Sequence, residues 1–228
     1  LINECITYGT KVIFTSSMAV YGEQTPPFTE DKRPQPVDPY GIAKYAVECD
    51  LKLANEQFGL RYNIVRPHNV LGIYQNIWDK YRNVIGIFIR KALNGEPILV
   101  YGDGEQTRAF SDIKYYMEPF DKLLTGHDGE TFNIGADKHF TLNEVALTVQ
   151  TIAAKYGYDV PIEHGEPRHE VKHAYCDHTK AKTLLQFEDH TNLAELVESM
   201  FTWAMKQPNR KVKQMEYEVT KDIYDYWK

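Results

Sequence analysis

Long apolar runs, a cysteine framework and an excess of basic charge are all missing from this sequence of 228 residues. No apolar run approaches the roughly 20 residues that a membrane-spanning helix needs, so we expect no membrane partner. The three cysteines, Cys5, Cys49 and Cys176, are far apart, which argues against disulfides and a four-cysteine zinc site and favours a cytoplasmic location. The formal net charge of −6 argues against nucleic-acid binding, which needs a basic face.

The composition is that of an ordinary globular protein, with 43% hydrophobic and 25% charged residues. A chain of this length can bury one core, or one large and one small lobe. It begins with Leu1, and residues 1–7 have the pattern of the tail of a helix. No charged segment followed by an apolar stretch indicates a signal peptide. We therefore expect the sequence to begin in the middle of a domain.

Strand and helix patterns alternate along the chain. Short apolar, β-branched runs predict strands at 11–15, 62–65, 98–101 and 131–134. Asp38-Pro39 predicts the start of a helix that ends at Gly59, and a proline-rich loop precedes it at 23–39. Helices are also predicted at 84–93, at about 141–156 and at about 192–206, the last two from capping patterns. The alternation predicts an α/β fold with a mostly parallel sheet.

Tyr40 and Lys44 lie four residues apart at the start of the helix predicted after Asp38, so their side chains share one face. A free tyrosine has a pKa of about 10. A nearby ammonium favours the phenolate, so the pair can act as a general base and acid near neutral pH. Ser17, at the end of the first strand, could hold a substrate hydroxyl group beside them.

The Tyr-x-x-x-Lys spacing alone is weak support, since it recurs at 217–221 and 224–228. A bare match is explained by a solvated helix face. Only the pair at 40–44 follows both a strand that ends in Ser-Ser and a proline-rich loop.

Six ordered motifs extend this context: FTSSMAVYG at 14–22, PYGIAK at 39–44, RPHNV at 66–70, GDGEQTR at 102–108, FNIG at 132–135 and AYCD at 174–177. Together they resemble the extended short-chain dehydrogenase/reductase family, and within it the NAD-dependent nucleotide-sugar epimerases of the UDP-glucose 4-epimerase type. The resemblance covers residues 1–205. It implies the C-terminal half of a Rossmann-type doubly wound NAD domain at 1–75 and a smaller substrate-binding lobe at 76–205, with some segments returning to the sheet. Residues 206–228 form a tail.

The resemblance also implies roles for individual residues. Ser17 matches the catalytic serine, Tyr40 the base, and Lys44 the lysine that binds the nicotinamide ribose and lowers the pKa of the tyrosine. His68 matches a residue near the nicotinamide. The implied substrate-binding residues also include Ser17 and the asparagines Asn69 and Asn83. Arg108 and Arg168 match the arginines that hold the pyrophosphate, and Tyr175 matches a position beside the hexose. The strand at 99–101 matches the one whose backbone meets the uracil.

The implied activity is epimerisation of a nucleotide sugar through transient oxidation of C4 by NAD, in a homodimer that forms through the helix carrying Tyr40. Ala43, Ala46 and Val47 would serve that contact or the core. The 228 residues do not contain the glycine-rich loop that holds the NAD pyrophosphate in this family, and Gly102-x-Gly104 does not replace it. We therefore expect this fragment alone to be inactive.

Another NAD-dependent nucleotide-sugar epimerase or a dehydratase of the same family is the alternative within this chemistry. The sequence does not fix the sugar, the nucleotide or the carbon that is inverted. Arg108 is followed by Ala109, and position 115 is Tyr115, where the family often has acids, which leaves the local ion pairing open. The dehydratases of the family carry Asp-Glu just after the serine, where this chain has Met18-Ala19, which disfavours dehydration.

Two readings lie outside this chemistry. His169, Glu170 and His173 fit the H-E-x-x-H pattern of a zinc hydrolase. A non-catalytic sugar-nucleotide-binding protein is the other alternative, against which the intact set of Ser17, Tyr40 and Lys44 argues.

Overall fold

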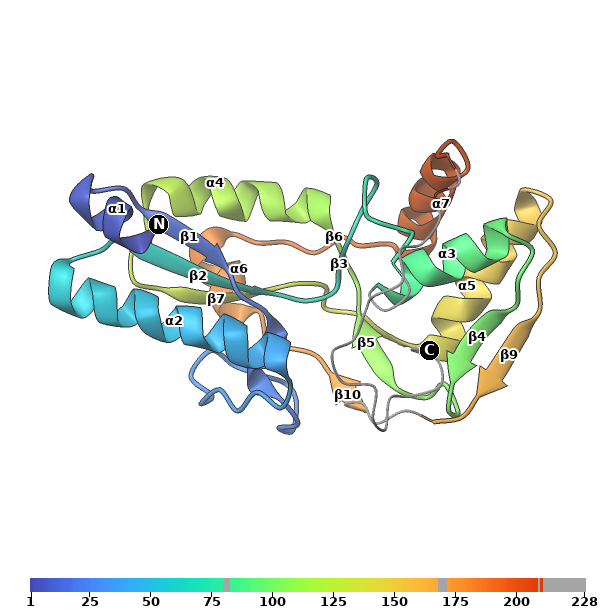
Figure 1. Ribbon diagram of the computed structural model, residues 1–228, viewed down its shortest axis with the longest axis horizontal. Helices are drawn as coiled ribbons and strands as arrows, with labels where there is room; N and C mark the ends of the chain where they lie inside the picture. The colour runs from blue at the N-terminus through green and yellow to red at the C-terminus, as the bar shows by residue number, and fades with distance from the viewer. Residues whose placement is uncertain (80–82, 168–171, 209, 211–228) are drawn as a thin grey trace.

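The computed structural model describes residues 1–79, 83–167, 172–208 and 210. One half is built on a parallel sheet with the order β1-β2-β7, formed by β1 (Val12–Thr15), β2 (Tyr62–Pro67) and β7 (Thr131–Ile134). Thr15 pairs with Val65, and Pro67 pairs with Ile134. The three strands therefore run in the same direction, and their carboxyl ends point toward the other half of the molecule (Figure 1).

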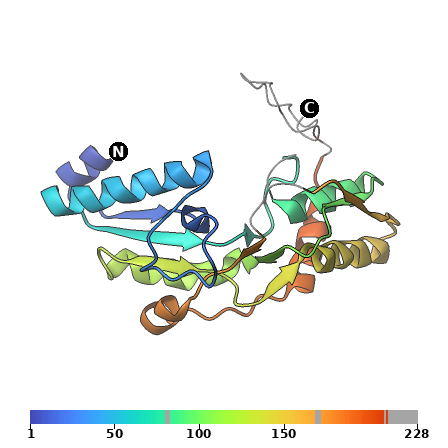
Figure 2. The ribbon, with the colours of Figure 1, turned by 90° about the horizontal axis from the view of Figure 1, so that it is seen from below.

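Helices cover both faces of this sheet. The helices α1 (Ile2–Thr7) and α2 (Pro39–Phe58) lie on one face, and α4 (Met117–Thr125) and α6 (Thr179–Leu185) lie on the other (Figure 2). This three-layer arrangement confirms the expected α/β class with a doubly wound, Rossmann-type sheet.

The other half has a core of its own. The parallel pair β4 (Ile98–Tyr101) and β9 (Ile162–Gly165) packs with α3 (Val84–Leu93), α5 (Leu142–Lys155) and α7 (Leu193–Ala204). The short strands β5 (Thr107–Ala109), β8 (His139–Thr141) and β10 (His173–Ala174) form a small sheet between the halves, with β5 in the middle. The pair β3 (Val70–Leu71) and β6 (Ser111–Asp112) joins them, and the 3-10 turns η1 (Met18–Tyr21) and η2 (Ile113–Tyr116) complete the described elements.

The start and end of α2 follow from its capping residues. The Asp38 carboxylate accepts a hydrogen bond from the Gly41 amide at 2.7 Å, and Gly59 ends the helix with a φ of 68°. The predicted bounds are confirmed. Of the three residues expected to serve the dimer contact or the core, Ala43 and Ala46 are exposed and lie outside the core, whereas Val47 is partly buried and packs against it.

The capping box expected at the start of α5 is also present. The Thr141 hydroxyl accepts a hydrogen bond from the Glu144 amide at 3.1 Å, and the Glu144 carboxylate accepts one from the Thr141 amide at 2.7 Å. Within the described residues, no helix combines the length and apolar character that crossing a membrane requires.

Candidate active site

A cavity of about 580 Å³ opens at the carboxyl ends of β1 and β2. Parallel α/β sheets bind ligands at this edge, because the loops that follow the strands leave a crevice there. The start of α2 borders the cavity on one side, and β5 and β10 border it on the other. The residues that line it are Ser17, Met18, Ala19, Gly22, Glu23, Phe28, Val37, Asp38, Tyr40, Pro67, Asn69, Arg108 and Ala174.

Ser17 is the second residue after the carboxyl end of β1 and caps the start of η1. Its backbone is extended, and its hydroxyl oxygen accepts a hydrogen bond from the Ala19 amide at 3.1 Å. The Ser17 hydroxyl is thereby held at the wall of the cavity.

Tyr40 lies in the first turn of α2, lines the same cavity and is 47% exposed. The Lys44 ammonium lies 5.7 Å from the centre of the Tyr40 ring and 5.1 Å from that of Phe14. It donates a hydrogen bond to the Thr15 carbonyl oxygen at 2.8 Å. The structure therefore brings Ser17, Tyr40 and Lys44 together, with the ammonium fixed at the end of β1 beside the phenol ring.

Two of the expected substrate-binding residues also line this cavity. Asn69 follows β2 with a φ of 27°, and its amide nitrogen donates to the Ala109 carbonyl oxygen at 2.8 Å. Arg108 lies on β5, and its guanidinium donates to the carbonyl oxygens of Thr107, at 2.9 Å, and Lys172, at 3.3 Å. Backbone carbonyl groups thus hold the Arg108 side chain on the side of the cavity opposite α2.

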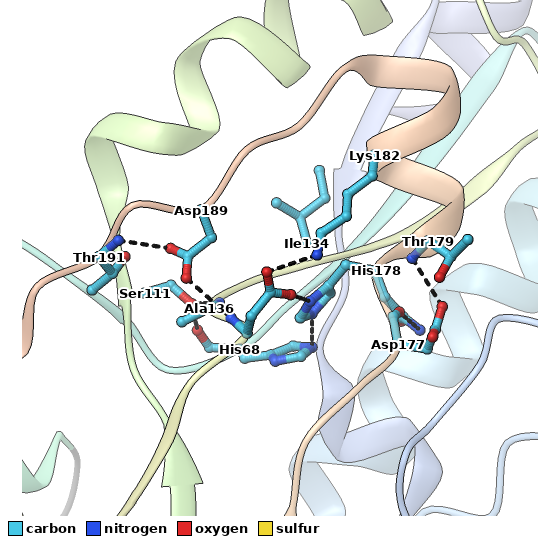
Figure 3. Close-up of polar contacts among 12 residues, drawn as sticks. His68, Ser111, Ile134, Ala136, Asp177, His178, Thr179, Lys182, Asp189 and Thr191 are labelled. Carbon is cyan, nitrogen blue, oxygen red and sulfur yellow. Dashed lines mark hydrogen bonds and ion pairs between the residues drawn. The ribbon is translucent and has the colours of Figure 1, made fainter.

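His68 lies elsewhere: it is fully buried and is not among the residues that line the cavity. Its Nε2 atom lies 3.3 Å from Nε2 of His178, and Nδ1 of His178 lies 3.2 Å from the Asp137 carboxylate, to which Lys182 donates at 2.7 Å (Figure 3). Burial lowers the pKa of His68 well below its usual value and also lowers the pKa of His178. Both imidazoles are therefore neutral. In the tautomers that satisfy these contacts, Nδ1–H of His178 donates to Asp137, and Nε2–H of His68 donates to Nε2 of His178.

Two further expected substrate residues do not line the cavity. Asn83 precedes α3, and its side-chain oxygen accepts a hydrogen bond from the Gly86 amide at 3.3 Å, so it caps this helix. The ring of Tyr175 stacks on His139, with centres 4.9 Å apart and an angle of 9°. Arg168 lies outside the described residues.

Only one residue of the zinc-type motif can be placed, since His169 and Glu170 also lie outside the described residues. The Nδ1 atom of His173 lies 2.9 Å from the Thr107 hydroxyl. The described part of the chain holds no group of three or more His, Cys, Asp or Glu residues that could bind a metal ion.

A second cavity, of about 800 Å³, lies at the carboxyl ends of β4 and β9. Tyr101, at the end of the strand expected beside the uracil, is one of its residues. The others are Gly102, Asp103, Gln106, His164, Gly165, Glu166, Pro167 and Lys172.

A buried polar cluster behind the first cavity was not expected from the sequence. We call it the Glu48–Arg66 cluster; its other members are Ser16, Tyr21 and Asn133. The Arg66 guanidinium donates to both oxygens of the Glu48 carboxylate, at 2.9 and 2.6 Å, and to the Tyr21 hydroxyl at 2.8 Å. Ser16 donates to Glu48 at 2.5 Å, and Tyr21 donates to the Asn133 side chain at 2.8 Å. Burial raises the pKa of Tyr21 far above its usual value, so it is a neutral donor.

The sequence carried one signal for this cluster. Glu48 continues the spacing of Tyr40 and Lys44 by one more helical turn, so it shares their face of α2. That face packs on the sheet, and a carboxylate there needs a buried cation as its partner. Arg66, within the otherwise apolar strand β2, meets that need.

Comparison with protein families matches residues 1–135, more than half of the chain, to the NAD dependent epimerase/dehydratase family. The chain belongs to this family. Among similar proteins, the putative UDP-glucose 4-epimerase of Methanocaldococcus jannaschii is 34% identical over 203 residues, which cover 88% of this chain and 64% of the relative. The UDP-N-acetyl-alpha-D-glucosaminuronate decarboxylase of Bacillus cytotoxicus is 33% identical over 210 residues, which cover 85% and 63%. This member of the epimerase/dehydratase family therefore spans less than two thirds of these relatives.

Solved structures of the family share the fold. The UDP-glucose 4-epimerase of Thermotoga maritima, determined with UDP-glucose, superimposes with a TM-score of 0.81 at 33% identity over 90% of this chain and 66% of the other. The UDP-N-acetylglucosamine 4-epimerase of Methanobrevibacter ruminantium, in complex with UDP-N-acetylmuramic acid, gives a TM-score of 0.82 at 30% identity over the same shares.

Proposed function

We propose that this chain carries the proton-transfer site of an NAD-dependent epimerase that inverts C4 of a UDP-hexose, of the UDP-glucose/UDP-galactose type. One observation carries the proposal. Ser17 and Tyr40 line one cavity at the carboxyl ends of parallel strands, and the Lys44 ammonium is fixed beside the Tyr40 ring. A hydroxyl, a phenol and a cation in this arrangement suit reversible proton exchange with a sugar hydroxyl.

Each of the three residues has a distinct part. The Tyr40 oxygen takes the proton from the C4 hydroxyl and returns it after the sugar has turned over. The Ser17 hydroxyl donates a hydrogen bond to the C4 oxygen. The Lys44 ammonium stabilises the phenolate and, through its hydrogen bond to Thr15, stays at the cavity while the proton moves.

The residues present fit the nicotinamide end of NAD, since Tyr40 lines the cavity at the strand ends where such a ring is bound, and Lys44 bonds to the last residue of β1. NAD supplies the acceptor and donor of the C4 hydride when it is bound. We propose Tyr40, Lys44 and His68 as the residues at the nicotinamide; His68 directly follows β2, and its buried ring bonds to His178. The 228 residues hold no G-x-G-x-x-G loop for the pyrophosphate.

The two cavities support a diphosphate-linked substrate. Arg108 borders the first cavity with a side chain held by backbone carbonyls, and a permanently charged guanidinium suits a phosphate. Tyr101 borders the second, where a nucleoside could lie. We also propose Arg168 as a phosphate ligand, from the resemblance alone.

We further propose a homodimer through α2. Ile42 is 55% exposed, and Ala43 and Ala46 are also exposed, so the helix presents a small apolar surface to a second copy. Gel filtration of the chain with and without Ile42→Lys checks this proposal.

The test uses the 228-residue chain alone and joined to the part of the Methanocaldococcus jannaschii relative that it does not match. Both are incubated with NAD and with UDP-glucose, UDP-galactose and their glucuronate and N-acetyl analogues, and the sugars are read by NMR. We expect C4 epimers from the joined protein. A decarboxylated, dehydrated or unchanged sugar in every incubation would contradict the proposed reaction, as stoichiometric zinc in the purified chain would.

A further inference from the structure

The Glu48–Arg66 cluster lies on the elements that carry the proton-transfer groups Ser17, Tyr40 and Lys44, and on the neighbouring strand β2. Ser16 precedes Ser17 at the end of β1, Glu48 lies one turn beyond Lys44 on α2, and Arg66 precedes Pro67 at the end of β2. The distances are those of strong, charge-assisted hydrogen bonds: 2.5 Å from Ser16 to Glu48, and 2.6 and 2.9 Å from Arg66 to Glu48.

Water cannot compete for these bonds. Glu48 is fully buried, Arg66 is 1% exposed and Ser16 is 2% exposed. A buried guanidinium–carboxylate pair contributes little net stability compared with a well-packed apolar pair, because both charges lose their hydration. The fixed geometry of two parallel hydrogen bonds is what an apolar pair could not supply.

The cluster also extends to the loop that contains Phe28, which lines the cavity. The Tyr21 hydroxyl, held by Arg66, donates to Asn133, whose amide nitrogen bonds to the Phe28 carbonyl oxygen at 3.0 Å. Phe28 lines the cavity and stacks on Tyr21, with ring centres 4.9 Å apart. One set of bonds thus joins β1, α2, β2 and the loop that contains Phe28.

We propose that Glu48 and Arg66 are positioning residues for the reaction: their bidentate pair, tied to Ser16, sets Tyr40 and Lys44 at the right distance from Ser17. Neither residue touches the substrate. This inference rests on the proposed function for its effect on turnover. Its geometric part, the placement of α2 against β1, is independent of any activity.

The geometric part is tested on the 228-residue chain alone. In the wild type, NMR should show a nuclear Overhauser contact between the Lys44 side chain and the ring of Phe14. The Lys44 Nζ atom lies 5.1 Å from the centre of that ring. Glu48→Gln removes the charge but keeps the shape, and it should weaken or abolish that contact. Leu51→Ala, one turn along α2 and fully buried in the core, is the control, since it lowers stability without touching the cluster. It should keep the contact.

The kinetic part is tested on the joined protein. Glu48→Gln and the milder Ser16→Ala should lower kcat, by about 10- to 100-fold for the first, because a small misplacement of reacting groups has a large effect on rate. KM for UDP-glucose should change by less than about threefold, since Arg108 lies on another element. The double variant Glu48→Leu/Arg66→Met should be more stable to heat than Glu48→Gln, because no unpaired charge stays buried. Its kcat should stay low, because the bond to Ser16 is gone.

The outcomes separate the two proposals. A wild-type joined protein without turnover contradicts the proposed function and leaves the Overhauser test standing. If Ser16→Ala and the double variant fold and keep the contact between Lys44 and Phe14, the positioning role is wrong. It is equally wrong if Glu48→Gln lowers kcat no more than Leu51→Ala does.

Discussion

At the scale of single residues, two neutral imidazoles that face each other in the core make the free energy of unfolding depend on pH. Nε2 of His178 contacts His68 (Figure 3), whereas its Nδ1 contacts Asp137, to which Lys182 donates. Burial lowers the pKa of both histidines in the folded chain, whereas the unfolded chain keeps a pKa of about 6.5. The unfolded state therefore binds more protons below that pH.

It follows that the two histidines leave the free energy of unfolding unreduced above about pH 6.5. Below that pH they lower it as the solution becomes more acidic, by at most about 1.4 kcal/mol per pH unit for each histidine. Urea denaturation at about pH 7.5 and about pH 5 measures the loss. Glu30, whose pKa burial raises, contributes with the opposite sign. Comparison with His178→Phe cancels that contribution, and this variant should lose less stability on acidification than the wild type.

His190→Gln is the matched control, because His190 is exposed, and its contacts with Glu188 and with the ring of Tyr115 lie at the surface, away from the buried pair. It should show the same loss on acidification as the wild type. An equal loss of stability on acidification in the wild type and in His178→Phe would show that the buried pair is protonated or hydrated, contrary to the contacts described.

At the scale of elements, the first turn of α2 is held against η1 without space for a side chain at Gly41. A Cβ atom there would lie 2.7 Å from the Ala19 carbonyl oxygen. Alanine is ordinarily the better helix former by about 1 kcal/mol. Here Gly41→Ala should instead destabilise the chain, and it should lower kcat of the joined protein, because Tyr40 must shift with the helix.

Gly59→Ala, at the other end of the same helix, is the control for that prediction. Gly59 has a φ of 68° and open space around its Cα, so alanine adds about 1–2 kcal/mol of backbone strain and no clash. Stability should fall while kcat stays unchanged. A Gly41→Ala protein with wild-type kcat would show that the close approach of α2 to η1 does not place Tyr40.

Elements were predictable where a local signal fixes them. Asp38, Pro39 and Gly59 set both ends of α2, and Thr141 with Glu144 sets the start of α5, because caps act within one turn. The short strands β3, β5, β6, β8 and β10 were not predicted. Each has two or three residues, too few for a periodic pattern, and depends on partners distant in the sequence.

At the scale of the whole molecule, the residues of the site that could be predicted were again those with a local signal in the sequence. Ser17, Tyr40 and Lys44 belong to motifs close to one another in the sequence, and the structure brings them together. The partner of His68 lies 110 residues away, so nothing local could have shown that its ring faces the core. For Arg66 the sequence carried only an indirect signal, the placement of Glu48 on the buried face of α2, because the two partners lie on different elements.

The first cavity has walls from the ends of β1, α2 and β2 on one side and from β5 and β10 on the other. Figure 1 shows that these elements belong to the region where the two halves of the molecule meet. Reacting groups come from the first set of elements, and the arginine proposed for phosphate comes from the second. This division suits a substrate whose diphosphate stays bound while its sugar turns.

The most direct measurement of this account is the rate of C4 epimerisation of UDP-glucose by the joined protein and its Tyr40→Phe variant, read by NMR of the sugar. Tyr8→Phe, at an exposed position 77% accessible to solvent, is the matched control. Loss of the general base predicts a kcat lower by about 10²- to 10⁴-fold for Tyr40→Phe and unchanged for Tyr8→Phe. Wild-type turnover by a folded Tyr40→Phe protein would contradict the account.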